Sequence, residues 1–567
     1  MGTSGNRTGF KVFSINTTVR NPQRNLEFLE YFQKFNGLVF DNKIKMLYLI
    51  ELVKNGVYKF SNISNAIKEK LDNDIALNEQ EIKEAFENNP QATGFSGRVM
   101  TQLRALKDQG FLIFSDDKSP IITMTNIAFE LVGRKTSITD IYAKIMIGLH
   151  SNNPARTSLL NKARPFLNTI FVIDLLKKEW SKLGEHNKNK ETKGILKHEF
   201  KSFILGMKDC DYKKCVREIL AYRKIYGLEE NKEYIAQYLF EKQGLERVKY
   251  ETLNDYADEV FRKFEMSGLL IARGVAKYIY YDFSRFESAK VQALLEQYKD
   301  GYSCVNFATT QEYIAFLDSV NLPWIQNESV RKSVVAQKAK SLNVSVNTSE
   351  FENLDELETR LNQAFYTKSL QGKIEKSEIA DLLNELRILA SAKESQSNDF
   401  KNIPESLRLE YLLALILGKK YGLNNLQSNL IYNENGEPLS YAPAGKADLV
   451  YENCNFEATM IKNRNQQLNS ETTSIARHLY ESQKQNALEQ RAVLIAPYIH
   501  FDVALFFKFC AKEFESKLAP ISISSFIELV EKSATFREFS ANFDRLFVDK
   551  LLCDKTDEYV DSVNFTR

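Results

Sequence analysis

The sequence lacks any long apolar run. No stretch approaches the roughly 18 residues that a membrane helix needs, and the first ten residues, MGTSGNRTGF, contain no apolar core. We therefore expect neither a membrane span nor a signal peptide, and predict a cytoplasmic protein. Proline and glycine are also scarce, with 11 and 23 residues, and 43% of the chain is apolar. This composition argues against long disorder and indicates a soluble globular protein.

Metal-ligand and disulfide patterns of cysteine are absent as well. The six cysteines form no CxxC pair; they are residues 210, 215, 304, 454, 510 and 553. Free thiols in a reducing compartment fit this spacing better than disulfides or a zinc site.

Two cofactor motifs are missing. The chain has no GxxxxGK[ST] phosphate loop and no N/D-P-P-Y/F/W methylation motif, so we expect neither ATP nor S-adenosylmethionine. A motor-driven subunit and a methyltransferase are both disfavoured. The net charge of +2 is close to neutral, so any surface for nucleic acid must come from local clusters of basic residues.

The most informative stretch runs from 441 to 471. Alternation of apolar and polar residues predicts one strand over 447–451 and a second over 454–461, joined by a tight turn at Glu452 and Asn453. Pairing these strands antiparallel can bring Asp448 and Glu457 together. Two adjacent carboxylates repel unless a cation lies between them, and a hard divalent ion is the usual solution. The alternative is a pair of solvated edge residues.

Helices and strands alternate around this hairpin. Helices are expected over 404–420, 471–489 and 502–515, and strands over 492–496 and 521–523. The order predicts an α/β domain with a mixed sheet and helices on both faces. Glu410 lies in the apolar context of the first helix and is a candidate third acidic ligand, although an ordinary helix-dipole or solvated role is the alternative.

The N-terminal half contains two units in which a helix is followed by a glycine and a hairpin. In the first, Val99, Leu103 and Leu106 share one face and Gly110 ends the helix. Such a unit predicts a winged helix, whose last helix can enter the major groove of DNA. A unit used only for packing, or for protein interaction, is the alternative. The candidate DNA-contacting residues of this unit are Arg98, Gln102 and Arg104 of the helix and Lys118 of the wing.

The second unit has its helix over 253–266 and its strand pair over 269–281. Basic residues lie near this pair and near the N-terminus, where they can bind phosphate. These candidates are Arg247, Lys249, Arg273 and Lys277, together with Arg20 and Arg24 in a basic turn. The lysine-rich stretch 188–201 more often indicates a solvated surface.

The order Glu410, Asp448, Glu457 resembles the PD-(D/E)xK nuclease core. The stretches APAGKADLVYE, ExxxxxRH from Glu471 to His478, and LIAP from 494 to 497 resemble the AlwI family of type IIS restriction endonucleases and their strand-nicking relatives. FSGRVMTQLRALKDQGFL and SGLLIARG are similar to the winged-helix subdomains of that family's recognition region. The motif departs in two ways: no proline adjoins Asp448, and Thr459 stands where a lysine is expected.

The resemblance implies a multidomain α+β protein of the bacterial cytoplasm. It implies four domains: winged-helix recognition subdomains at 1–160 and 161–290, a helical linker at 291–399 with a hinge near 391–399, and a PD-(D/E)xK nuclease domain at 400–567. It further implies that the enzyme binds a short asymmetric duplex sequence and cuts a few base pairs outside it.

The resemblance also implies roles for individual residues. Asp448, Glu457 and Glu410 would bind one or two Mg²⁺ ions, and Glu471 would join the catalytic set. Lys446, Lys462 and Glu471 are candidates for the group that orients or deprotonates water. Arg477 and His478 could contact phosphate; for His478 a packing role is the alternative that we favour.

The implied partners are double-stranded DNA, a separate methyltransferase that protects host DNA, and a transient homodimer or second nuclease subunit. A nicking endonuclease would need no dimer. A DNA-binding regulator with an inactive nuclease fold is the competing hypothesis. The residues fix neither the recognition sequence, nor the cleavage offset, nor the number of strands cut.

Overall fold

A computed structural model describes most of the chain. The described residues are 21–55, 57–58, 63–72, 75, 77–87, 95–134, 136–155, 162–181, 194–243, 250–274, 278–347, 353–443, 445–485, 490–513, 517–548 and 556–564. Contacts divide the chain into two compact units. The first comprises residues 1–25, 36–39 and 100–361, and the second comprises 26–35, 40–99 and 362–567.

The four-domain division remains a prediction. Residues 26–35 and 40–99 group with the C-terminal part of the chain, and the polar stretch 391–399, expected to be a hinge, lies inside the second unit. Among the described helices, none is both long enough and apolar enough to span a bilayer.

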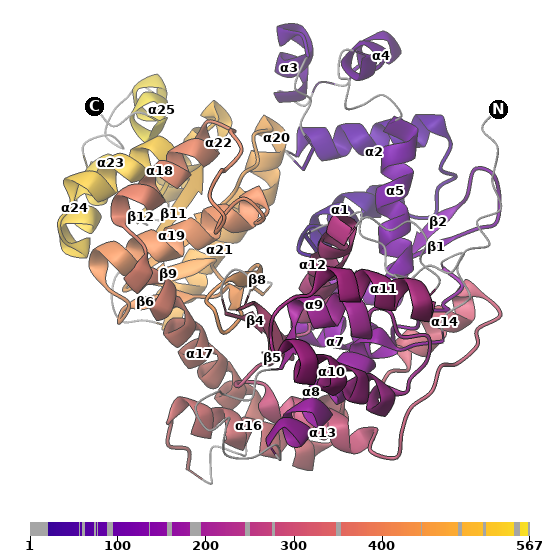
Figure 1. Ribbon diagram of the computed structural model, residues 1–567. Helices are drawn as coiled ribbons and strands as arrows, with labels where there is room; N and C mark the ends of the chain where they lie inside the picture. Colours follow the sequence, from indigo (N-terminus) through magenta and orange to yellow (C-terminus); the bar gives the residue numbers. More distant parts are fainter. Residues whose placement is uncertain are drawn as a thin grey trace. The chain divides into compact units, whose positions relative to one another are not determined.

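The first unit is mostly helical (Figure 1). Near its start is a hairpin that follows a helix, and residues 95–99 of this helix group with the second unit. Helix α5 (Phe95–Asp108) is followed by the antiparallel strands β1 (Leu112–Phe114) and β2 (Ile122–Met124). Gly110, at a φ of 83°, separates them. A Cβ atom there would collide with Leu317, so both the backbone angle and the close packing require glycine. The helix, glycine and hairpin expected from the sequence are thus present; their assignment as a winged helix remains a proposal.

A second helix followed by a hairpin lies in the same first unit. Helix α12 (Tyr250–Glu265) precedes strands β4 (Leu270–Arg273) and β5 (Tyr280–Phe283), which pair antiparallel. A short third strand, β3 (Ile195–Leu196), pairs with β5. The other elements of the first unit are α6 (Asn126–Gly133), α7 (Ile138–Gly148), α8 (Pro165–Ser181), α9 (Lys197–Glu199), η4 (Phe200–Ile204), α10 (Tyr212–Tyr226), α11 (Lys232–Gln243), α13 (Ser288–Gln297), α14 (Thr310–Asp318), α15 (Pro323–Gln326) and α16 (Glu328–Leu342).

The second unit is built on a five-stranded mixed sheet in the order β12-β11-β10-β9-β6. The strands are β6 (Leu426–Ser428), β9 (Leu449–Tyr451), β10 (Cys454–Ala458), β11 (Arg491–Ala496) and β12 (Lys517–Ser522). Strand β10 pairs antiparallel with β9 and parallel with β11, and β11 pairs parallel with β12. Parallel neighbours need a crossover connection; α21 (Thr472–Gln485) and α22 (Phe501–Glu513) provide it.

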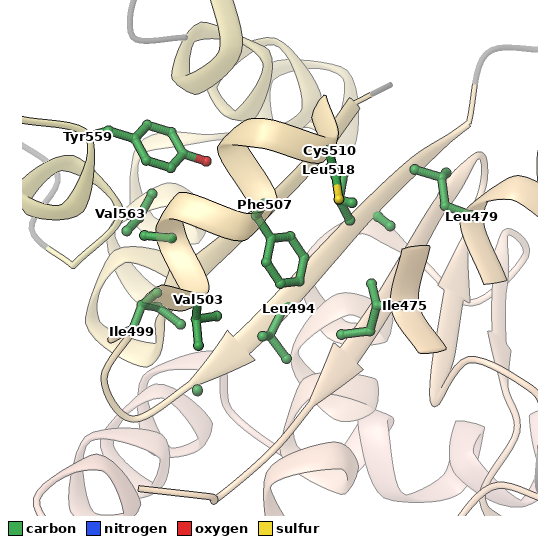
Figure 2. Close-up of a cluster of buried hydrophobic side chains, with 13 residues drawn as sticks. Ile475, Leu479, Leu494, Ile499, Val503, Phe507, Cys510, Leu518, Tyr559 and Val563 are labelled. Carbon is green, nitrogen blue, oxygen red and sulfur yellow. The ribbon is translucent and has the colours of Figure 1, made fainter. Parts of the chain in front are cut away.

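One face of this sheet packs on the crossover helices. Figure 2 shows Phe507 of α22 extending toward the sheet, where Leu494 of β11 and Ile475 of α21 lie. Helix α25 (Thr556–Asn564) adds Tyr559 and Val563 to this buried cluster. The mixed sheet with helices and the crossover order agree with the α/β domain that the sequence predicts. The last strand was expected over 521–523, but β12 spans Lys517–Ser522 and Ile523 begins the helix that follows.

The opposite face is aromatic. Phe456 of β10 lies 6.0 Å from the ring of Phe539, and Tyr451 of β9 lies 4.3 Å from that of Phe536. Phe536 and Phe539 belong to α24 (Phe536–Val548). Helix α23 (Ile523–Lys532) adds Phe526, and α19 (Glu405–Tyr421) adds Tyr421 at its last residue.

The crossover from β10 to β11 is a continuous helical run with a π-helical turn. Helix α20 (Arg464–Gln466) leads into the π-helix η7 (Gln467–Glu471), which continues as α21. The remaining elements of the second unit are α1 (Arg24–Phe32), η1 (Gln33–Phe35), α2 (Asn42–Lys54), α3 (Asn65–Asp72), α4 (Glu79–Glu87), α18 (Ile379–Ala390), β7 (Ile431–Tyr432) and β8 (Pro438–Ser440). Helix α17 (Leu354–Lys376) crosses the boundary between the units.

The cysteines behave as the sequence predicts. The five within the described residues have free thiols, at positions 210, 215, 304, 454 and 510. Cys553 lies outside the described residues.

Candidate functional site

The predicted hairpin forms, but its strands are shorter than the expected 447–451 and 454–461: β9 begins at Leu449, after Asp448, and β10 ends at Ala458. In the register of β9 and β10, Leu449 pairs with Phe456 and Val450 with Asn455. Asp448 lies one residue before β9, and Glu457 is the residue after Phe456 on β10. Both acidic residues therefore lie at the same end of the strand pair.

Asp448 reaches across to the neighbouring strand. Its Oδ2 atom accepts a hydrogen bond of 2.8 Å from the backbone N–H of Ala458. The side chain is half-buried. This bond holds one oxygen of the Asp448 carboxylate at the residue that follows Glu457.

Glu457 is a buried carboxylate, 7% exposed. Burial raises its pKa, and hydrogen bonds from the His478 side chain and the Asp448 backbone lower it only in part, so that the pKa stays above its ordinary value. A carboxylate held this way is poorly solvated in its charged form. A cation or a proton on Glu457 would relieve that cost.

His478 lies against this carboxylate. Its Nδ1 atom donates to Oε1 of Glu457 at 2.7 Å, and its side chain is 11% exposed. Within the described part of the chain, Nε2 of His478 has no hydrogen-bond partner. When Nδ1 carries the proton, Nε2 is the basic nitrogen of the ring. The sequence analysis did not foresee this bond to Glu457; both the packing role and the phosphate contact of His478 stay predictions.

Glu410 lies on α19 and is 4% exposed. Helix α19 packs against β9 and β10. Burial chiefly, and the charge of Glu410 in addition, raise the pKa values of Tyr432 and Tyr441. Glu410 is thus a buried acid on a helix that contacts both strands of the hairpin, and its role as a metal ligand remains a prediction.

The residues proposed around the missing motif lysine differ in how exposed their side chains are. Thr459 is 5% exposed, and its hydroxyl accepts a bond of 3.2 Å from the backbone N–H of Ile461. Lys446 is exposed and Lys462 is half-buried. Glu471 ends η7, and its side chain lies outside the described residues. Arg477 is exposed and lies 4.0 Å from Glu481 in an ion pair.

A buried glutamine holds the loop after β10, a feature that the sequence analysis missed. Gln467 is fully buried, and its Nε2 atom donates to the carbonyl oxygens of Ile461 and Tyr498 at 3.1 and 2.9 Å. Its Oε1 atom accepts from the backbone N–H of His500 at 3.2 Å. The exits of β10 and β11 are thereby joined. Spacing alone gives no signal for this residue, because its partners are backbone atoms of distant loops.

The donor set near Asp448 fits Mg²⁺. This ion usually keeps several waters and takes one or two protein carboxylates plus substrate phosphate, and the hairpin offers two carboxylates at one end of its strand pair. Among the described residues, no group of three or more His, Cys, Asp or Glu side chains is placed to hold a metal ion. Metal binding by Asp448, Glu457 and Glu410 therefore stays a prediction.

The predicted DNA-contacting residues of the first helix and hairpin differ in exposure where their side chains are described. Arg104 and Lys118 are exposed. Gln102, expected to lie away from the apolar face of α5, is 8% exposed and buried. It lies three residues after Val99 and four before Leu106, so helical spacing sets it beside the buried face. The side chain of Arg98 lies outside the described part.

The other basic candidates are only partly described. Arg24 is half-buried. Arg273 donates from Nη2 to the carbonyl oxygen of Phe283 at 2.8 Å, within the β4–β5 hairpin. Four candidates lie outside the described residues: Arg20, Arg247, Lys249 and Lys277. The roles of all these residues in DNA binding remain predictions.

Comparison with known proteins gives one family. The family model described as AlwI restriction endonuclease matches residues 108–529. A search of curated proteins finds no match.

Solved structures give weaker likenesses. The small subunit of the heterodimeric restriction endonuclease R.BspD6I is 19% identical, over 32% of this chain and 97% of that one, with a TM-score of 0.27. The restriction endonuclease FokI is 11% identical over 94% of this chain and 99% of that one, with a TM-score of 0.23. FokI bound to DNA gives 10% identity, coverage of 95% and 97%, and a TM-score of 0.22.

Proposed function

This chain belongs to the AlwI restriction endonuclease family, and from that membership we propose that it is a type IIS endonuclease whose cleavage requires Mg²⁺. It would bind a short asymmetric duplex sequence and hydrolyse phosphodiester bonds a few base pairs outside it. The observation that carries the proposal is that the Asp448 carboxylate is bonded to the backbone N–H of Ala458, the residue next to Glu457, while His478 is bonded to Glu457.

Asp448 and Glu457 are the residues that would hold the ion. A bound Mg²⁺ supplies positive charge at the phosphate oxygens and acidifies a water molecule. The raised pKa of Glu457 supports this role, because a buried carboxylate gains most from a neighbouring cation. Glu410 and Glu471 are proposed as additional acidic groups of the site.

His478 is proposed as the proton acceptor of the reaction. With its Nδ1–H on Glu457, the ring presents Nε2 as a base. A water oxygen would form a bond to phosphorus, and the proton of the water would pass to Nε2. One P–O ester bond would break, and the leaving sugar oxygen would take up a proton from solvent. Arg477, one residue earlier on α21 and exposed, is proposed to contact phosphate. These roles do not depend on a lysine at position 459.

Recognition is assigned to the N-terminal helix and hairpin units. Arg104 and Lys118 are exposed on the first of them, where cationic side chains can bind phosphate or base edges. A separate methyltransferase would protect host DNA. Because one acidic pair cuts one strand, a double-strand break needs a transient homodimer, a second nuclease subunit or a second event; a nicking enzyme needs none of these.

The test is digestion of supercoiled plasmid with Mg²⁺, followed by run-off sequencing of both strands. We expect cleavage at a fixed offset from one asymmetric sequence, and the number of strands cut distinguishes an endonuclease from a nickase. Asp448→Ala should abolish cleavage and keep binding to the same duplex.

A matched control is Glu452→Gln, which changes a carboxylate at the exposed tip of the same hairpin. It should cleave like the wild type. Sequence-specific binding by the wild type without any cleavage would instead identify a DNA-binding regulator with an inactive nuclease fold. Cleavage by Asp448→Ala at the wild-type rate would refute the proposed site.

A further inference from the structure

Two hydrogen bonds join helix α21 to strand β10. His478 Nδ1 donates to Glu457 Oε1 at 2.7 Å, and Asn455 Nδ2 donates to Ser482 Oγ at 3.1 Å. Asn455 and Glu457 are two residues apart on the strand and therefore share a face. His478 and Ser482 are four residues apart on the helix and therefore lie one turn apart along one side. The two bonds run side by side between the same pair of elements.

Apolar packing alone fixes α21 less well. Ile475 and Leu479 lie in the buried cluster with Leu494 and Phe507 (Figure 2). Such contacts hold the helix against the sheet, but the hydrophobic effect has no preferred direction. A helix that slides by one residue moves about 1.5 Å, which apolar contacts can tolerate and a hydrogen bond of 2.7 Å cannot.

Asn455 is an unusual residue for its place. It is 3% exposed in a central strand, where asparagine is disfavoured and a buried amide costs free energy unless it is hydrogen-bonded. Its register partner on β11 is Ala492, so the neighbouring position on the same face is apolar. An aliphatic residue would suit this face better if packing were the only requirement.

We propose that Asn455 and Ser482 are positioning residues, which fix the height and rotation of α21 so that His478 keeps Nδ1 on Glu457 and presents Nε2 to the phosphate. The inference rests on the proposed function, because the purpose of the alignment is proton transfer at that site. Neither residue touches the substrate; both act through His478.

The kinetic test uses Ser482→Ala, which removes a half-buried hydroxyl, in the full-length protein. Loss of alignment by about 1 Å can cost up to about 100-fold in rate, so we expect a loss of about 10-fold in kcat with KM for duplex DNA changed less than twofold. Ser482→Thr retains the hydroxyl and should recover most of kcat. Thr473→Ala, at an exposed position of the same helix, is the control and should match the wild type.

The decisive comparison is made in the His478→Ala background. If Ser482 acts through the imidazole, adding Ser482→Ala to His478→Ala should lower kcat no further. A further loss of about 10-fold in that background would overturn the proposal, and so would a Ser482→Ala variant that cleaves at the wild-type rate.

A second measurement does not need cleavage. The chain has five histidines, so the imidazole nitrogens can be followed by NMR in histidine-labelled protein, with His478→Gln assigning one of them. We expect His478 to be a single Nδ1–H tautomer in the wild type and in Thr473→Ala, and a mixture in Ser482→Ala and Asn455→Ala. Unchanged His478 signals in both of these variants would overturn the proposal.

The two measurements separate the two hypotheses. If the wild type cleaves no DNA but Ser482→Ala changes the His478 tautomer, the proposed function fails while the alignment of His478 by Ser482 stands. If the wild type cleaves and Ser482→Ala leaves kcat unchanged, the positioning role fails while the nuclease stands.

Discussion

The two faces of strand β10 differ in chemistry. On one face Phe456 lies among the rings of Phe526, Phe536 and Phe539. On the other face Asn455 and Glu457 bond to side chains of α21. Alternate residues of one short strand thus serve an aromatic core and a buried polar network.

The contrast shows how a fold can tolerate a buried carboxylate that destabilises it. Each aromatic pair contributes only about 0.5–1.5 kcal/mol beyond its buried area. Several such pairs together hold the strand on the face opposite Asn455 and Glu457. Glu457, whose pKa is raised by burial, opposes folding when it is charged. We infer that the aromatic face stabilises the strand on which the polar face depends. The predictions below test this division of roles.

The largest expected effect is on the polar face. Glu457→Gln should lower cleavage by at least about 10³-fold, equivalent to about 4 kcal/mol, because the amide cannot supply a charged ligand. The melting temperature should stay the same or rise, since a buried charge is removed while an acceptor for His478 is kept. Rates of plasmid cleavage and thermal unfolding check the two effects, and cleavage within tenfold of the wild type would contradict the first.

On the aromatic face the expected pattern is the reverse. Phe456→Ala should destabilise the protein by about 3–5 kcal/mol, the usual cost of removing a buried aromatic side chain. Phe509→Ala is the control, because Phe509 is 60% exposed on α22; it should change stability little. Denaturant unfolding measures both. If Phe456→Ala loses no stability, the aromatic face does not support the strand.

A smaller effect is expected at the other end of the sheet. Asp544 accepts from Arg491 Nη2 at 2.6 Å and Lys517 Nζ at 2.9 Å. Burial raises the pKa of Asp544, but these two bonds outweigh burial, and the net pKa is lowered. Asp544→Asn should cost about 2 kcal/mol at neutral pH. The difference from the wild type should disappear as pH falls through the lowered pKa, which unfolding measurements across the acid range would show.

Glu457 should show the opposite pH dependence, with the smallest effect. Its raised pKa means that the folded chain keeps the proton to a higher pH than the unfolded chain. Its stabilising contribution is therefore present below the ordinary value of 4.5 and is lost as pH rises through the folded pKa. Relative to Glu457→Gln, the wild type should lose at most about 1.4 kcal/mol per pH unit in that window. A flat difference in unfolding free energy would show that Glu457 does not titrate abnormally.

The sequence predicted the local part of the site. Alternation and a two-residue turn predicted the hairpin, and the register of Leu449 with Phe456 confirms it. The turn also accounts for the positive φ of 51° at Glu452. Such features depend on neighbouring residues, which periodicity reports directly.

The non-local part of the site was not predictable in this way. The bond between Glu457 and His478 depends on the rotation of α21 against β10, and no pattern within either element specifies that rotation. Gln102 shows a different error. Its spacing from Val99 and Leu106 already indicated burial, but it was placed on the exposed face of the helix because its side chain is polar. Polarity is a poor guide at the edge of an apolar stripe.

The π-helical turn η7 lies in the helical run between Glu457 and His478. A π turn holds one more residue than an α turn, so a one-residue deletion there can be absorbed by conversion to a regular helix without rotating the residues on either side. The number of residues between the hairpin glutamate and the histidine is therefore free to vary by one among proteins that keep the same pair. A motif written with a fixed gap between these two residues would overlook such relatives.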